Sequence, residues 1–403
     1  MRSFKFIIIP TVLFLFPGFT QAGWVSQTSG TTNGLLSVDF PVDASTGYAV
    51  GSNGTILKTT NSGAAWASQT SGTTNWLLSV HFPADASTGY AVGDSGTILK
   101  TTDGGANWVR QTSGANGYLF SVHFPVDALT GYAVGYSSTI LKTANGGTTW
   151  DILPSDTTAL FRSVHFPRDA STGYVVGGWG HILKTTDGGA TWLPQTSGTT
   201  NKLYSVHFPA DALTGYAVGG SFLFSSTILK TTNGGTNWVT QSSGTSAYLA
   251  SVHFPVDAST GYAVGEYGTI LNTTDGGVNW VIQIPGGGYE LNSVYFPVDA
   301  STGYAVGAGG TILKTTDGGV GVEKTAGVRD QGLGIRVTAT PNPFISFTRI
   351  SGHEAERFAL YDIAGRRVGT YKGNRIGMDL RPGVYFIKAL EREAGLGRIV
   401  KVR

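Results

Sequence analysis

Four acidic residues are candidates for the paired carboxylates that a glycoside hydrolase needs. Most acids between residues 23 and 320 recur at fixed positions of a repeated unit, but Asp94, Asp156, Glu266 and Glu290 do not. Hydrolysis of a glycosidic bond uses two carboxyl groups on opposite sides of the sugar. Glu266 and Glu290 belong to adjacent units and form the best available pair. An exported glycoside hydrolase is therefore one interpretation of the chain.

Histidines at one repeated position suggest a metal site at first sight. His–metal bonds are about 2 Å long, and equivalent side chains of seven units around one axis lie too far apart to coordinate one metal ion. We therefore expect these side chains to pack and to hydrogen-bond between units, with no metal and no cofactor. The position holds His81, His123, His165, His207 and His253, with Asp39 and Tyr295 in the other two units.

Aromatic and charged residues that break the repeat suggest a binding surface. Exposed aromatic side chains mixed with a few charges are typical of surfaces that bind peptides or carbohydrates. We predict that such a surface binds a glycan or a protein without any catalytic group. Drift of unconstrained loop sequences is the alternative explanation. The predicted binding residues are Trp76, Tyr118, Tyr136, Trp179, Phe222, Phe224, Tyr248, Glu266, Tyr267 and Glu290.

A unit of about forty residues, repeated seven times, must position all of these side chains. The run GTILKTT or a close variant begins at Gly54, Gly96, Ser138, Gly180, Ser226, Gly268 and Gly310. One unit contains four predicted strands, at Leu77–Phe82, Gly89–Gly93, Thr97–Thr102 and Trp108–Thr112. Four short antiparallel strands make one blade, so residues 23–320 are predicted to form an all-β, seven-bladed β-propeller.

The direction of the strands divides the connections between two faces. Turns between first and second strands, and between third and fourth strands, share one face and hardly vary. The other face, called the variable face below, carries the second-to-third turns and the connections between units. The predicted binding residues lie there. On the constant face we expect the repeated Asp of the first turn to cap backbone amides, and we expect the repeated Lys of the third strand, such as Lys58, to place its ammonium group in water.

The turn between third and fourth strands repeats the pattern Thr-x-Asp/Asn-x-Gly-x-x-Trp. It resembles the Asp-box, or BNR repeat, of sialidase-like propellers, and it begins at Thr59, Thr101, Thr143, Thr185, Thr231 and Thr273. A sialidase needs three Arg around one carboxylate. Only three Arg lie between residues 23 and 320, namely Arg110, Arg162 and Arg168. Arg168 falls on the constant face, away from where a sialidase site would lie. Three Arg therefore cannot surround one carboxylate, and sialidase activity is not expected.

The whole unit also resembles the photosystem II stability/assembly factor-like group of propellers. That resemblance implies a non-enzymatic binding scaffold, with a photosystem-type assembly factor as a further alternative. The seventh motif has Val322 in place of Trp, whereas Gly23–Thr28 matches a fourth strand. We therefore expect the N-terminal segment to supply the outer strand of the last blade.

The two ends of the chain predict export. Residues 1–22 have the charges, the apolar stretch and the small-residue site of a cleaved signal peptide, and no later segment is long and apolar enough to cross a membrane. After a Gly-rich linker (321–335), residues 336–403 are predicted to form a small Ig-like β-sandwich.

The C-terminal blocks beginning at Pro341, Phe358, Leu380 and Ile399 resemble the type A sorting domain of type IX secretion. That resemblance implies the type IX machinery as a partner and a secreted or cell-surface location, reached through the periplasm of a Gram-negative cell. The charge changes from −7 over residues 23–320 to +7 over residues 336–403, and the basic residues are too evenly spread for a nucleic-acid site.

Overall fold

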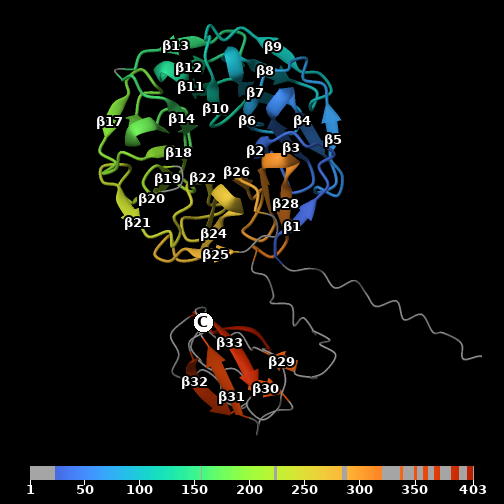
Figure 1. Cartoon of the computed structure of the whole chain (residues 1–403). Helices are drawn as coiled ribbons and strands as arrows, with labels where there is room; N and C mark the ends of the chain where they lie inside the picture. Colours follow the sequence, from blue (N-terminus) through green and yellow to red (C-terminus); the bar gives the residue numbers. More distant parts are fainter. Residues whose placement is uncertain are drawn as a thin grey trace, which may run out of the picture. The chain divides into compact units, whose positions relative to one another are not determined.

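The computed structural model describes residues 23–319, apart from 156, 222–224 and 284–287, and six strands between residues 336 and 402 (Figure 1). The chain divides into two compact units, Met1–Gly321 and Val322–Arg403. No helix in the described part of the chain is long and apolar enough to span a bilayer.

Seven four-stranded antiparallel sheets form the first unit and are arranged as the blades of a propeller (Figure 1). This confirms the predicted all-β, seven-bladed propeller. The innermost strands of blades 1 to 7 are β2 (Leu35–Asp39), β6 (Leu77–His81), β10 (Leu119–His123), β14 (Phe161–His165), β18 (Lys202–His207), β22 (Leu249–His253) and β26 (Leu291–Tyr295). The second strands are β3 (Gly47–Gly51), β7 (Gly89–Gly93), β11 (Gly131–Gly135), β15 (Gly173–Gly177), β19 (Gly215–Ser221), β23 (Gly261–Gly265) and β27 (Gly303–Gly307).

The outer half of each blade is shorter. The third strands are β4 (Ile56–Thr59), β8 (Ile98–Thr101), β12 (Ile140–Thr143), β16 (Ile182–Thr185), β20 (Ser225–Thr231), β24 (Ile270–Thr273) and β28 (Ile312–Thr315). The outermost strands are β5 (Ala67–Gln69), β9 (Val109–Gln111), β13 (Asp151–Leu153), β17 (Leu193–Gln195), β21 (Val239–Gln241), β25 (Val281–Gln283) and, in blade 7, β1 (Val25–Gln27).

The core lies between the blades and is built from the same aromatic residues each time. Tyr48 of blade 1 stacks on Phe82 of blade 2 with ring centroids 3.9 Å apart, and Trp108 meets the same Phe edge-on at 6.0 Å. The buried Tyr48 hydroxyl donates to the carbonyl of Ala86 at 2.8 Å. A Cβ atom on Gly89 would lie 2.4 Å from the Phe82 ring, which explains why this strand begins with glycine.

Side chains of the constant face satisfy backbone groups in the turns, as predicted. In the Asp-box of blade 2, the Thr101 hydroxyl accepts the Gly105 amide at 2.8 Å, and Asp103 accepts the amide four residues further on at 2.9 Å. Gly105 has φ +88°, a conformation that favours glycine. In the first turn, Asp85 accepts the Ser87 amide at 2.8 Å.

The prediction for the repeated Lys is wrong. Its ammonium group does not end in water but crosses to the neighbouring blade, where Lys58 donates to the carbonyl of Gly104 at 2.7 Å. The same nitrogen lies 5.4 Å from the centroid of the Tyr48 ring. Among the described residues, no donor from its own blade reaches this carbonyl. Lys58 reaches it from blade 1, and so does the Tyr48 hydroxyl at 3.0 Å. The Lys therefore ties adjacent blades together.

The N-terminal segment completes the Asp-box of blade 7, as predicted. Strand β1 pairs with β28, and the Gly23 amide donates to Asp317 at 2.9 Å. In a continuous Asp-box the Asp accepts the amide of the residue four positions further along the chain instead. Trp24 takes the place of the missing Trp. Its ring meets Phe296 edge-on at 5.9 Å, and its indole N–H donates to Gln283 at 2.8 Å. One Asp-box is thus assembled from the two ends of the ring.

The second unit is described only by its strands. A two-stranded sheet contains β29 (Arg336–Thr338) and β30 (Arg349–Ser351). A four-stranded antiparallel sheet has the order β32 (Arg367–Lys372), β31 (Arg357–Tyr361), β33 (Gly383–Ala389) and β34 (Gly397–Val402). The predicted Ig-like sandwich rests on residues outside the described part of the chain. The predicted signal peptide and linker also lie outside it.

Candidate functional site

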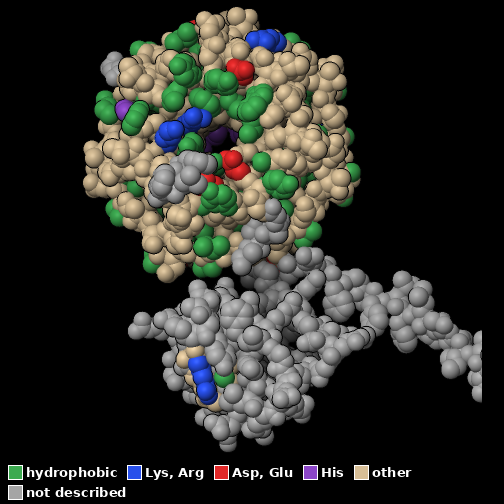
Figure 2. All heavy atoms as spheres, in the orientation of Figure 1, with side chains coloured by type: hydrophobic (Ala, Val, Ile, Leu, Met, Phe, Trp, Pro, Cys, Tyr) green, Lys and Arg blue, Asp and Glu red, His purple; other side chains and the backbone are tan. Residues whose placement is uncertain are grey.

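The variable face surrounds the mouth of the central channel. Figure 2 shows basic and acidic side chains close to the central opening and a histidine inside it. One-turn 3-10 helices lie on this face between second and third strands: η1 (Ser52–Gly54), η2 (Asp94–Gly96), η3 (Tyr136–Ser138), η4 (Gly178–Gly180), η5 (Glu266–Gly268) and η6 (Ala308–Gly310).

One position of the innermost strands lines this mouth. A shift in register follows the first β residue of the blade, as between Leu119 and Ser121 in β10, and leaves the next two residues half-buried rather than in the core. The residue inside this register shift differs strongly between blades, in contrast to its neighbours. It is Leu36, Leu78, Phe120, Arg162, Tyr204, Ala250 or Asn292.

Arg162 lies between two aromatic rings and has no anionic partner. Its guanidinium carbon is 4.0 Å from the centroid of the Phe120 ring and 5.7 Å from that of Tyr204. Within residues 23–319 as described, no carboxylate lies within 4 Å of it. Burial lowers the pKa of Arg162, against the opposing effect of Tyr204, but an Arg stays charged in proteins. The mouth therefore presents a cation whose hydrogen-bond donors are available.

Aromatic contacts extend from Arg162 around the mouth. Tyr118 stacks on Phe120 at 5.8 Å, and Tyr204 lies 5.4 Å from Tyr248. The Tyr248 hydroxyl donates to the carboxylate of Glu290. Burial and this acceptor raise the pKa of Tyr248. We call this set the aromatic arc; it spans blades 3 to 7 and contains Tyr118, Phe120, Arg162, Tyr204, Tyr248 and Glu290.

Two bulky residues on the variable face adopt a strained backbone conformation. Trp179 in η4 and Tyr267 in η5 have φ +58° and +57°, and their side chains are 77% and 62% exposed. Other blades place Asn53, Ser95 or Gly309 there, residues that tolerate this conformation better. Strain in the backbone of an exposed side chain does not stabilise the fold.

The structure brings together some of the predicted binding residues but not all. Tyr118, Tyr248 and Glu290 are part of the arc. Trp76 and Tyr136 are 49% and 51% exposed but make no aromatic contact with it among the described residues. Phe222 and Phe224 lie outside the described residues. Phe120, Arg162 and Tyr204 were missed, although the variation at this position of the innermost strands was a signal in the sequence.

The prediction that Glu266 is exposed on the variable face is wrong. Its side chain is only 4% exposed, and neither carboxylate oxygen has a hydrogen-bond partner among the described residues. The η5 turn is anchored by the Glu266 amide, which donates to the carbonyl of Tyr248 at 3.0 Å, and Tyr267 occupies the exposed position instead. Because Glu266 is covered, it does not open onto the face with Glu290 as a hydrolytic pair would.

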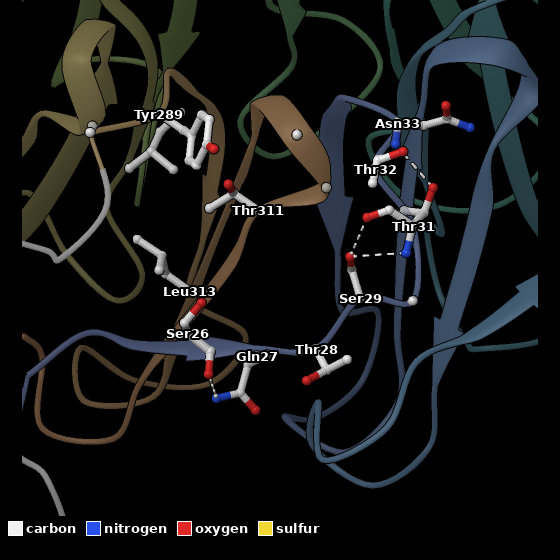
Figure 3. Close-up of a pocket in the computed structure, with 16 residues that line it drawn as sticks. Ser26, Gln27, Thr28, Ser29, Thr31, Thr32, Asn33, Tyr289, Thr311 and Leu313 are labelled. Atoms are coloured by element: carbon white, nitrogen blue, oxygen red, sulfur yellow. Dashed lines mark hydrogen bonds between the residues drawn. The ribbon is translucent and has the colours of Figure 1, made fainter.

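Two grooves on this face belong to the architecture of the repeat. One of about 830 Å³ lies beside β1, between Thr28, Asn33 and Tyr289 (Figure 3), and a similar one of about 860 Å³ follows at the next blade. The Ser29 hydroxyl that lines both grooves is already used, because it donates to the Thr31 carbonyl and accepts the Thr31 amide. The same loop recurs in other blades, so these grooves do not mark one particular binding site.

The histidines of the innermost strands hydrogen-bond between blades, as predicted. The amide of Phe208 in blade 5 donates to Nδ1 of His165 in blade 4 at 3.3 Å, and His123, His207 and His253 accept equivalent bonds. Asp39 accepts the corresponding Phe82 amide at 2.7 Å. Neighbouring rings around the axis lie 4.8–5.0 Å apart.

Comparisons with known proteins identify one matching family and several solved structures with the same fold. The family described as Photosynthesis system II assembly factor YCF48 matches residues 17–112, 65–157, 111–193 and 237–325. Among solved structures, "YCF48 bound to D1 peptide" is 20% identical, with a TM-score of 0.61 over 74% of this chain and 99% of that one. YCF48 from Cyanidioschyzon merolae is 22% identical, with a TM-score of 0.61 over 73% and 99% of the two chains.

An enzyme shares the same fold. The GH74 xyloglucanase from Xanthomonas campestris is 13% identical, with a TM-score of 0.61 over 73% of this chain and 53% of that chain. At such identities these likenesses concern the fold alone. No curated protein matches the chain.

Proposed function

Since the chain belongs to the photosynthesis system II assembly factor YCF48 family, we propose that its propeller is a non-enzymatic scaffold that binds a segment of another protein on the variable face. The observation that carries this proposal is the aromatic arc, with the unpaired Arg162 between Phe120 and Tyr204. A solved member of the family is described as bound to a peptide. The strained, exposed Trp179 supports the same face.

The chemistry of the arc favours a segment that combines an acidic group with apolar or aromatic side chains. A guanidinium group that lies over aromatic rings can form two parallel hydrogen bonds to a carboxylate. The surrounding rings exclude water from that contact and provide apolar area, as in the centres of protein interfaces. The arc is too irregular from blade to blade to bind a repeating ligand through identical contacts, so we favour a single segment docked in one orientation.

One substitution in the arc and one at Trp179 test this proposal against an array of short immobilised peptides of varied charge. We expect Arg162→Gln to weaken capture of the selected peptides at least about tenfold. Trp179→Asn is expected to weaken capture too, yet to stabilise the protein by about 1 kcal/mol because the backbone strain is relieved. Arg110→Gln, on the exposed outer strand β9, is the matched control and should change neither. Equal capture by the wild type and Arg162→Gln would contradict the proposal.

We also propose that the protein is exported to the cell surface or the medium by type IX secretion. The proposal rests on the resemblance of the C-terminal blocks to a sorting domain and on the signal-like residues 1–22. Because sorting and binding would reside in separate units, deletion of residues 336–403 should leave a folded propeller in the periplasm. Fractionation and immunoblotting measure this, and normal surface display of the truncated protein would refute it.

A further inference from the structure

The central channel carries a ring of imidazoles whose protonation is set by the backbone. The amides of Phe166, Phe208, Phe254 and Phe296 donate to Nδ1 of His123, His165, His207 and His253. A backbone amide can only donate, so each Nδ1 must be an acceptor, and the neutral ring then carries its hydrogen on Nε2. These four Nε2–H groups can donate a hydrogen bond but cannot bind a metal ion.

The four Nε2–H groups have no partner of their own. Among the described residues no hydrogen bond is formed by Nε2 of His123, His165, His207 or His253, whereas Nε2 of His81 contacts the Phe124 carbonyl at 3.1 Å. The rings are half-buried on the innermost strands, so their accessible edge faces the channel, and Figure 2 shows histidine inside the opening. Donors without acceptors in a confined space are the groups that bind anions in proteins.

A second layer of donors lies above this ring, on the side of the aromatic arc. The Ser163 hydroxyl accepts the Val206 amide at 3.2 Å, so its own hydrogen is free to point elsewhere, and Ser121, Ser205 and Ser251 accept equivalent bonds. One further residue up the strand, Arg162 adds a positive charge at the mouth. On the side of blades 3 to 6 the channel is therefore lined by donors from the mouth to the ring.

The opposite side of the histidine ring contains a carboxylate, and this determines where an anion can lie. Asp39 accepts the Phe82 amide at 2.7 Å and lies 3.8 Å from His81, while Tyr295 stacks on His253 at 4.8 Å. Burial raises the pKa of Asp39, although His81 and the backbone donors act against this. An anion would lie away from Asp39, near the four free imidazoles.

We propose that the central channel binds a small oxyanion of the sulfate or phosphate type at the level of the histidine ring. The Nε2–H groups of His123, His165, His207 and His253 hold it, assisted by the serine hydroxyls above. Neighbouring rings 4.8–5.0 Å apart around the axis leave an opening a few Å wide, which suits an ion of about that size with hydrogen bonds of about 3 Å. This site is separate from the surface proposed for peptides.

Two substitutions of His165 test its role as a donor to the anion separately from its role as an acceptor of the Phe208 amide. In the full chain, His165→Gln keeps an acceptor for the Phe208 amide and a donor for the anion, whereas His165→Glu keeps the acceptor and replaces the donor with a charge. The probes are sodium sulfate, sodium phosphate and, to test for a carboxylate of a partner, sodium acetate, each at constant ionic strength. Binding is measured by calorimetry and by the NMR signals of the imidazole Nε2–H groups.

We expect sulfate or phosphate to bind the wild type and His165→Gln and to shift the Nε2–H signals, and His165→Glu to bind at least about tenfold more weakly. Preference for acetate would replace the inorganic oxyanion with a carboxylate and overturn the proposal as stated. Unshifted signals, or equal binding by His165→Glu and His165→Gln, would also overturn it. Peptide capture by the aromatic arc is measured separately and can succeed or fail independently.

Discussion

Replacing Trp24 with Ala is expected to lower the free energy of unfolding of the propeller by about 3–5 kcal/mol. The Trp24 side chain is 8% exposed and belongs to the core between blades 6 and 7, where it meets Tyr262 and Phe296 edge-on. The substitution removes that packing and leaves Gln283 without its indole donor. The ring would then depend on β1 alone for its closure.

Fluorescence provides a clean measurement of this effect. All nine tryptophans of the chain lie between residues 24 and 280, so urea unfolding followed by tryptophan emission reports on the propeller and not on the C-terminal unit. Trp108→Ala, which removes the equivalent side chain from a continuous Asp-box, should cost a similar amount. Trp76→Ala, on the exposed variable face, should cost far less. If Trp24→Ala behaves like Trp76→Ala, the N-terminal segment does not close the ring.

The propeller is also expected to lose stability steeply as the pH falls from about 6.5 to about 4. Burial, and next to it the neighbouring imidazoles, hold the pKa of His123 and His165 well below the usual value of 6.5, and burial does the same for His253. Burial lowers the pKa of His207 to about 4. An imidazolium has no acceptor, so protonation would also break the hydrogen bond from the next blade.

The sign follows from where protons bind. Below about pH 6.5 the unfolded chain takes up protons at these histidines and the folded ring does not, so the unfolded state gains relative stability until the folded pKa is reached. Each histidine contributes at most about 1.4 kcal/mol per pH unit within that window. Asp39, whose pKa is raised, acts in the opposite direction, but it is one group against four.

Urea unfolding between pH 4.5 and 7.5 measures this slope. The double variant His165→Gln/His207→Gln keeps acceptors for the backbone amides but removes two titrating groups. Its stability should therefore depend less on pH than that of the wild type, by up to about two protons in the slope. Parallel curves for the two proteins would show that the ring does not cause the acid sensitivity.

The propeller and the way it closes could be predicted from the sequence, because both follow from the pattern of the repeats. Val322 where Trp is expected, together with an unmatched Gly23–Thr28 strand, identified the split blade. The arc could not be predicted in the same way, because strict alternation along Leu119–His123 would place Ser121 beside Leu119 in the core. A register shift reverses this and exposes Phe120 and Ser121 instead. Nothing in a short strand reveals such a shift.

Contacts between blades were the second feature that could not be predicted from the sequence. The ammonium of Lys58 finds the Gly104 carbonyl 46 residues away, and no local pattern shows that this carbonyl lacks a partner in its own turn. The burial of Glu266 depends likewise on how η5 is anchored to the neighbouring connection. By contrast, the loops that carry Tyr118, Tyr248 and Glu290 were recognisable, because comparison of the repeats separates variable positions from constant ones.

The Asp-box assembled from Gly23, Trp24 and Asp317 has a consequence for the order of events during synthesis. Its two parts are separated by 294 residues, so strand β1 must wait until almost the whole propeller has been synthesised before it finds its partner. Contacts at such separation form late and slowly. Until then β1 and Trp24 are available for wrong pairing, and the edge of blade 7 stays open from its synthesis until β1 docks. We therefore expect a growing chain to need protection against aggregation up to its last blade.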